Sequence, residues 1–213
     1  LGAGEGENKK MKKVNLKIFL FCLFGVALQA NAATVSREFS GNDCSGYFGT
    51  GFDSCAVFVY SGDEKIELSP VIAKFNEGFS LSDTNSTLFP SVDGTEFNFS
   101  STSSGNKTGT WDYSPGVDDP GVRYWSVKAG PKFLLFWEVA DAAVQTGGAC
   151  DVPDAYTLNC LNIALTVDTG DWTTPNNKSL SHITFYDTTV VPLPAAVWLF
   201  GSGLGLLGWM RRK

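Results

Sequence analysis

Seven short segments rich in β-branched and aromatic residues, each bounded by Gly, Pro, Asn, Asp or Ser, occupy the middle of this 213-residue chain. Such segments are typical of β-strands, and the polar clusters between them are typical of turns. The segments are Cys55–Tyr60, Thr95–Phe99, Gly109–Tyr113, Val122–Ala129, Lys132–Val139, Cys160–Val167 and His182–Asp187. Apart from Ile66–Phe75, where a short helix interrupted by Pro70 is expected, no stretch of the middle keeps a helical period over three turns. The middle therefore predicts an all-β fold, an antiparallel β-sandwich that is jelly-roll-like.

The clearest pair of strands is the hairpin Val122–Val139, with Gly130 and Pro131 at its turn. Its second strand, Lys132–Val139, carries apolar side chains on both faces. This pattern predicts a central strand that is covered on both sides.

The N-terminal part has the pattern of a secretory signal peptide. After Met11, the lysines at positions 12, 13 and 17 precede an apolar run from Ile18 to Leu28, and small residues follow at Ala30 and Ala32. We expect residues 1–10 to be an upstream extension, residues 11–32 to be the signal peptide, and cleavage to follow Ala32. An uncleaved anchor is the alternative, and the short apolar run disfavours it.

The C-terminal part combines a proline motif, an apolar stretch and a basic end. Ala195–Met210 contains no charged residue, which predicts a short transmembrane helix over residues 195–210. The final cations would remain in the cytoplasm, which places the middle of the chain on the far side of the membrane. The alternative is a buried C-terminal helix of a soluble protein. The motif residues are Val191, Pro192, Leu193, Pro194 and Ala195, and the basic end is Arg211, Arg212 and Lys213.

This order of signal peptide, globular middle, proline motif, apolar helix and basic cluster resembles that of the bacterial PEP-CTERM proteins. Pro192-Leu193-Pro194 stands where that family has Pro-Glu-Pro, and it is similar to the V-P-L-P-A variant. The resemblance implies that residues 190–213 are a sorting signal, cut by an exosortase-type membrane protease in a Gram-negative bacterium. The protein would then be anchored transiently and end at the cell surface or in the extracellular matrix, and residues 33–189 would form its domain.

The mature part is strongly acidic. Between Ala33 and Pro192 there are 8 Lys and Arg against 20 Asp and Glu, which gives a net charge of −12. Such a surface repels phosphate backbones, so nucleic acid is not expected as a partner.

Four cysteines remain once the signal peptide is removed: Cys44, Cys55, Cys150 and Cys160. An even number in an exported protein predicts disulfides, with three alternative connectivities. We favour the local pairs 44–55 and 150–160, because each closes a short loop that contains Gly or Pro. Zinc is disfavoured, because the C-x₂-C spacing does not occur and the chain has one histidine.

Residues suited to catalysis are few. A Ser–His–Asp arrangement would need His182, which falls inside a predicted strand without a G-x-S-x-G motif, so a structural role is favoured. Glu138 is a carboxylate in an apolar strand. Pairs of carboxylates could cleave glycans, but sequence alone does not show their geometry. No cofactor is expected, with calcium at Asp118-Asp119 or Asp168 and Asp171 as the alternative to ordinary turn chemistry.

The tryptophans suggest a role in binding. Trp111, Trp125 and Trp172 are candidates for stacking on sugar rings, although the favoured interpretation is that such rings mostly fill the core. Two functions follow as hypotheses. The first is a non-enzymatic surface or matrix protein that is adhesive or associated with exopolysaccharide, and the second is a secreted glycan-active enzyme with an Asp/Glu pair.

Overall fold

The structure, a computed structural model, describes residues 31–187. The predicted transmembrane helix over 195–210, the sorting motif, and the signal peptide up to Ala30 lie outside the described residues. Within residues 31–187 no helix has the length and apolar character needed to cross a bilayer.

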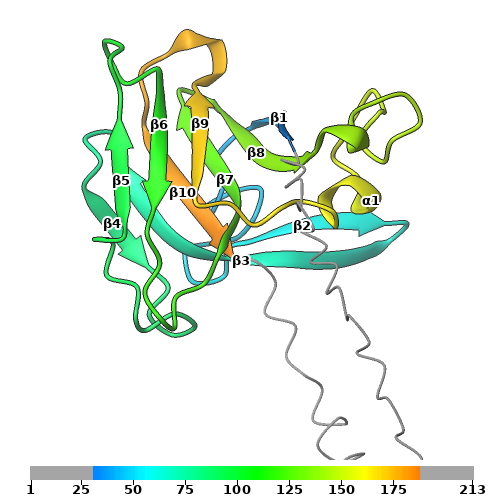
Figure 1. The fold of residues 1–213 in the computed structure, drawn as a ribbon. Coiled ribbons are helices and arrows are strands. Elements are labelled where there is room, and N and C mark those ends of the chain that lie inside the picture. The colour runs from blue at the N-terminus through cyan, green and yellow to red at the C-terminus, as the bar shows by residue number, and fades with distance from the viewer. Residues whose placement is uncertain (1–30, 188–213) are drawn as a thin grey trace, which may run out of the picture.

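Ten strands and a few short helical turns make up the described part (Figure 1). All strand pairs are antiparallel, which confirms the prediction of an all-β antiparallel fold. The elements are β1 (Ala32–Ser40), β2 (Ala56–Ser61), β3 (Glu64–Asn76), β4 (Leu81–Thr84), β5 (Phe97–Ser100), β6 (Thr108–Tyr113), β7 (Val122–Ala129), β8 (Lys132–Ala140), β9 (Thr169–Thr173), β10 (His182–Asp187), α1 (Leu158–Leu161) and the 3₁₀ turns Asp141–Ala143 and Pro175–Asn177.

The strands form two sheets of unequal size. The larger has the order β1-β8-β7-β10-β3-β2, with β4 also paired to β3, and the smaller has the order β5-β6-β9. In Figure 1 the smaller sheet stands in front of β7 and β10. This division into seven and three strands differs from a jelly roll, in which eight strands form two Greek keys.

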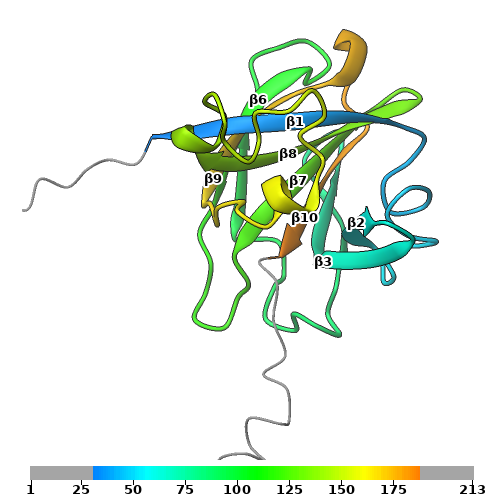
Figure 2. The same ribbon diagram turned by 90° about the vertical axis from the view of Figure 1, so that its right-hand side faces the viewer.

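Side chains on the two faces of the larger sheet form two separate cores. Along β7, Tyr124 belongs to one buried cluster and Trp125 to the other. Tyr186 and Phe185 of β10 alternate in the same way, as successive side chains of a strand must. The smaller sheet covers the Trp125 face, whereas the loops on either side of α1 and the loop after β1 cover the Tyr124 face (Figure 2).

The predicted hairpin is present. Ala129 pairs with Lys132 around Gly130 and Pro131, and Gly130 has a φ of +56°, which a glycine adopts without steric cost. β8 lies between β1 and β7, so the prediction of a central strand is confirmed.

Two sequence predictions of local structure are wrong. Ile66–Phe75 is not a helix but part of β3, where Pro70 faces Ala56 next to an irregularity in the β2–β3 pairing. Cys160–Val167 is not a strand, since α1 ends at Leu161 and its N-cap Thr157 accepts a hydrogen bond from the backbone N–H of Cys160.

In the smaller sheet, each tryptophan faces a glycine on the neighbouring strand. Trp111 of β6 pairs with Gly170 of β9, and Gly109 of β6 pairs with Trp172 of β9. A Cβ atom on Gly170 would lie 2.9 Å from the Trp111 ring, and one on Gly109 would lie 2.3 Å from the Trp172 ring. Glycine is therefore required at both positions so that the indoles can lie flat across the strands and fill the space between the sheets.

Candidate functional site

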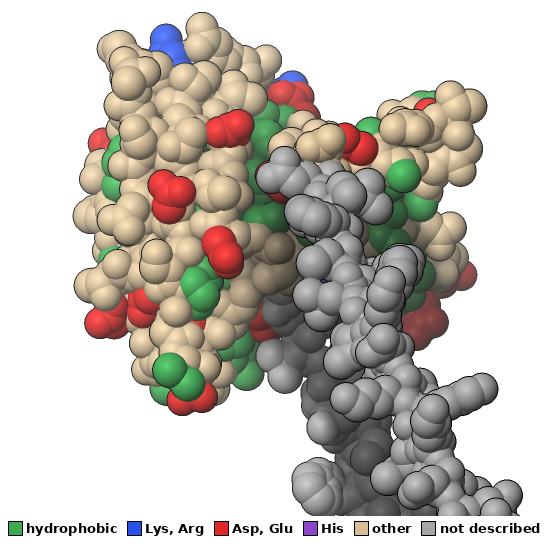
Figure 3. All heavy atoms as spheres, in the orientation of Figure 1, with side chains coloured by type: hydrophobic (Ala, Val, Ile, Leu, Met, Phe, Trp, Pro, Cys, Tyr) green, Lys and Arg blue, Asp and Glu red, His purple; other side chains and the backbone are tan. Residues whose placement is uncertain are grey.

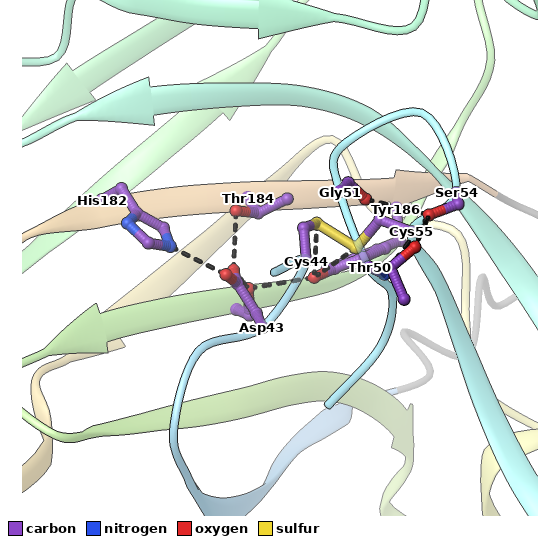
Figure 4. Close-up of a disulfide and its surroundings, with 10 residues drawn as sticks. Asp43, Cys44, Thr50, Gly51, Ser54, Cys55, His182, Thr184 and Tyr186 are labelled. Carbon is purple, nitrogen blue, oxygen red and sulfur yellow. Dashed lines mark hydrogen bonds and ion pairs between the residues drawn. A yellow bond between two sulfur atoms is a disulfide. The ribbon is translucent and has the colours of Figure 1, made fainter. Parts of the chain in front are cut away.

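A carboxylate is buried against one face of the larger sheet, over its central strands β7 and β10. Asp43, in the loop after β1, exposes 1% of its surface. Its Oδ2 accepts hydrogen bonds from Ser126 Oγ of β7 at 2.7 Å and Thr184 Oγ1 of β10 at 2.8 Å. Its Oδ1 lies 2.9 Å from His182 Nε2, also on β10 (Figure 4). Three side chains from two adjacent strands thus bind the carboxylate of Asp43, which belongs to a loop.

The charged form of Asp43 is stabilised by these partners. Burial alone would raise the pKa of this carboxyl. The hydrogen bond and charge of His182, together with the hydrogen bonds from Ser126 and Thr184, outweigh burial and hold the pKa of Asp43 well below its usual value. The carboxylate therefore stays ionised in the folded protein at every physiological pH.

Ser126, His182 and Asp43 are the residue types of a hydrolytic triad, but their order is unsuitable for catalysis. In a triad the imidazole lies between the hydroxyl and the carboxylate and takes the hydroxyl proton. Here the carboxylate lies between the other two, so that both Ser126 and His182 bind Asp43 and the imidazole is not placed to take the proton of Ser126. Ser126 is also fully buried and thus inaccessible to a substrate. The prediction that His182 is hydrogen-bonded is confirmed, and its structural role stays a prediction.

The same polar cluster lies against the first disulfide. The hydroxyl of Tyr186 is 3.3 Å from Ser126 Oγ and 3.8 Å from the sulfur atoms of Cys44 and Cys55. Burial strongly raises the pKa of the Tyr186 hydroxyl, so it remains protonated. The cluster fastens the loop after β1 to the sheet.

Both predicted disulfides are present. Cys44 is bonded to Cys55 and Cys150 to Cys160, and the Cα atoms of each pair are 4.9 Å apart. The cysteines are therefore not available as zinc-binding thiolates. The Trp137 indole N–H also lies 3.4 Å from the Cys160 sulfur, which places the second disulfide in the core.

The three tryptophans that were candidates for stacking on sugar rings are not accessible to a sugar, so this candidate role is wrong. Trp111 and Trp125 have no exposed surface, and Trp172 exposes 3%. The indoles of Trp111 and Trp125 meet edge to face at 5.3 Å between the two sheets. Their rings fill the core, which was the favoured interpretation.

The acidic residues considered for calcium have other contacts. Asp119 Oδ2 accepts a hydrogen bond from the Gly116 backbone N–H at 2.6 Å, which is ordinary turn chemistry. The backbone carbonyls of Asp168 and Asp171 accept hydrogen bonds from Tyr113 N–H and Trp125 Nε1. Within residues 31–187, no three His, Cys, Asp or Glu side chains gather closely enough to hold a metal ion.

Two further features involve carboxylates. An open hollow of about 380 Å³ includes Glu96, Asp118 and Asp119 in its lining.

Elsewhere, the Glu138 side chain of β8 is half-buried. Burial, and to a smaller extent the charge of Asp171, raise the pKa of its carboxyl. Glu138 of the larger sheet and Asp171 of the smaller sheet thus lie within electrostatic reach of each other.

Two tyrosines that the sequence analysis did not single out are exposed. All six tyrosines lie in the described part, and four of them are buried. The exceptions are Tyr47, which exposes 38% of its surface, and Tyr60, which exposes 59%. Neither lies in a recognisable motif: Tyr47 follows Gly46 in a turn-like segment, and Tyr60 ends the predicted strand Cys55–Tyr60, next to Ser61.

Comparisons of the chain with protein-family models, with curated proteins and with solved structures found no match.

Proposed function

We propose that this chain is an exported surface or matrix protein whose β domain is non-enzymatic and associates with exopolysaccharide. In this proposal residues 11–32 direct export through the inner membrane, and residues 190–213 anchor the precursor until an exosortase-type protease removes them. The sandwich of two packed sheets then remains at the cell surface or in the matrix as a stable binding scaffold.

The observation that carries the proposal is the pair of disulfides. Both bonds close short loops, both are packed into buried clusters, and disulfides of this kind persist in oxidising compartments outside the cytoplasm. This supports export independently of the terminal segments, because the four cysteines belong to the middle of the chain.

The buried polar cluster favours a binding protein over a hydrolase. His182 contacts the carboxylate of Asp43, and Ser126 is fully buried and does not reach solvent. Tyr47 and Tyr60, by contrast, are exposed, and exposed tyrosines are enriched on surfaces that bind other molecules.

The test of export and sorting is the intact mass of the protein from cells with and without an exosortase. We expect the signal peptide to be absent in both strains and about 20 C-terminal residues to be absent only where the protease is present. A full-length tail in both strains would contradict sorting and leave a membrane anchor.

A second candidate function is a secreted glycan-active enzyme, which the raised pKa of Glu138 and its proximity to Asp171 favour. Under this alternative, Glu138→Gln and Asp171→Asn would abolish release of reducing sugars from a polysaccharide that the wild type cleaves. Under the proposed function, the wild type releases no sugar and both variants retain its binding.

A further inference from the structure

Tyr47 and Tyr60 converge on one ring although they come from different segments. Tyr47 lies in the loop after β1, and Tyr60 lies near the end of β2; Figure 2 shows this loop beside the β2–β3 hairpin. The Tyr47 ring stacks on Phe58 at 5.5 Å with an interplanar angle of 5°. The Tyr60 ring meets Phe58 edge to face at 5.4 Å. The buried Phe58 thus supports two exposed rings.

The segment that carries Tyr47 is held in place from several sides. The Cys44–Cys55 disulfide closes it, and Asp43 is fixed in the sheet four residues before Tyr47. The Tyr47 N–H also donates to the Asn42 carbonyl at 2.8 Å. Because the backbone and the ring contacts are already ordered, little conformational freedom is left to lose when a ligand binds.

Two ion pairs flank the rings. On one side, Arg37 lies 2.7 Å from Asp154, and its guanidinium covers the Tyr156 ring at 5.1 Å. The same guanidinium lies 5.1 Å from the centre of the Phe39 ring, and the Phe39 and Tyr47 ring centres are 4.5 Å apart, so this ion pair lies beside Tyr47.

On the other side, Lys65 Nζ lies 2.8 Å from Glu67 and 4.4 Å above the Phe58 ring. Each cation of the group therefore has an acidic partner, and the group as a whole is electrically neutral. We call Tyr47, Phe58, Tyr60 and these two ion pairs the tyrosine surface.

We propose that the tyrosine surface binds a neutral polysaccharide. The apolar face of a sugar ring would pack on Tyr60 and Tyr47, and its hydroxyl groups would hydrogen-bond with the carboxylates of Asp154 and Glu67 and the guanidinium of Arg37. This inference rests on the proposed function and names the site and the class of glycan.

The charge of the domain selects against acidic polysaccharides. The mature part has a net charge of −12, and Asp and Glu side chains are widespread on the face shown in Figure 3. A polyanion would be repelled over most of the surface, and the tyrosine surface supplies no unpaired cation to compensate. A second copy of the chain is a less suitable ligand for this surface, because the area of two exposed rings is far smaller than the ~800 Å² that each partner buries in a stable interface.

The experiment is native affinity electrophoresis of the full-length chain, exported by a bacterial host, in gels that contain laminarin, galactomannan, dextran or alginate. We expect retardation by at least one of the three neutral polysaccharides and none by alginate. Tyr60→Ala should weaken this retention about tenfold, the effect of removing an aromatic anchor, whereas Tyr60→Phe should keep most of it. Tyr47→Ala should act in the same direction.

Leu88→Ala is the matched control, because Leu88 exposes a similar fraction of its surface, 55%, outside the tyrosine surface. It should leave retention unchanged, and thermal unfolding should show that Tyr60→Ala is folded. Retention that both tyrosine variants keep in full would overturn this inference but leave the proposed function standing. Retention by no polysaccharide would overturn both. Binding to alginate alone, or a dimer seen by sedimentation that Tyr60→Ala abolishes, would overturn the inference.

Discussion

The carboxylate of Asp43 lies 2.9 Å from the imidazole of His182, although 139 residues separate them in the chain. This contact joins the loop after β1 to the last strand of the described part, and Ser126 and Thr184 complete the attachment. The neighbouring residue, Cys44, is bonded to Cys55, so the loop is fixed by a covalent bond and an ionic network side by side. The exposed Tyr47 belongs to this same loop, which links the stability of the buried site to the geometry of the tyrosine surface.

Asp43→Ala should lower the free energy of unfolding by about 3 kcal/mol, because it leaves three buried polar partners without their shared acceptor. Urea unfolding at pH 7 measures this loss. Asp53→Ala is the control, since Asp53 lies in the same loop and is exposed, and it should change stability by less than about 0.5 kcal/mol. Equal effects of the two variants would contradict a structural role for the Asp43 network.

The stability that Asp43 provides should depend on pH. Its pKa is lower in the folded protein than in the unfolded chain, where the value is near 3.8, so acid protonates the unfolded state first. The contribution is therefore complete above about pH 4 and is lost as the pH falls below that value. The charged and titratable groups that face Asp43 are His182 and Tyr186 of β10 and Lys128 of β7.

The measurement is the difference in free energy of unfolding between the wild type and Asp43→Asn at several pH values from 7 to 3. This difference should stay constant down to about pH 4 and narrow below it, because the variant has no carboxyl to protonate. A difference that is independent of pH across the whole range would show that the ionised form of Asp43 is not the stabilising one.

Local patterns in the sequence were sufficient for most of the strands. Segments with a period of two and turn residues at their ends, such as Gly109–Tyr113 and His182–Asp187, match β6 and β10. β9 was not among the predicted strands, although Gly170 and Trp172 are buried while Thr169, Asp171 and Thr173 are exposed, the alternation of a strand with one buried face. Cys160–Val167 is a continuous apolar run, and periodicity cannot distinguish a buried strand from a short helix in such a run.

The sites could not be predicted in the same way, because they depend on contacts between distant segments. Asp43 sits among Gly, Asn and Ser and has the sequence signature of an ordinary turn residue. Only the fold brings it to His182. The candidate role of the tryptophans in sugar stacking was left open by the sequence for a related reason, since their exposure is decided by the packing of the second sheet, which no local pattern describes.

Loss of either disulfide should cost about 2–3 kcal/mol, since each bond closes a loop of about a dozen residues in the unfolded chain. The variants are Cys44→Ala with Cys55→Ala, and Cys150→Ala with Cys160→Ala, compared by urea unfolding. Peptide mapping without reduction should recover the 44–55 and 150–160 pairs from the exported wild type. Free thiols, or a peptide that joins one pair to the other, would contradict the connectivity.

Gly170→Ala should destabilise the protein by about 1–3 kcal/mol, because the new methyl group would lie 2.9 Å from the ring of Trp111. That ring has no exposed surface and packs against Trp125 and Phe185, so it cannot move aside without disturbing the space between the sheets. Gly78→Ala is the control, since a Cβ there has no atom within 4 Å. Alanine lowers the conformational entropy of the unfolded chain, so the free energy of unfolding should be unchanged or slightly higher. Thermal unfolding of the two variants, side by side, measures the contrast. If Gly170→Ala were as stable as Gly78→Ala, the Trp111 ring would not lie across β9, and the packing between the two sheets would have to differ from the one described.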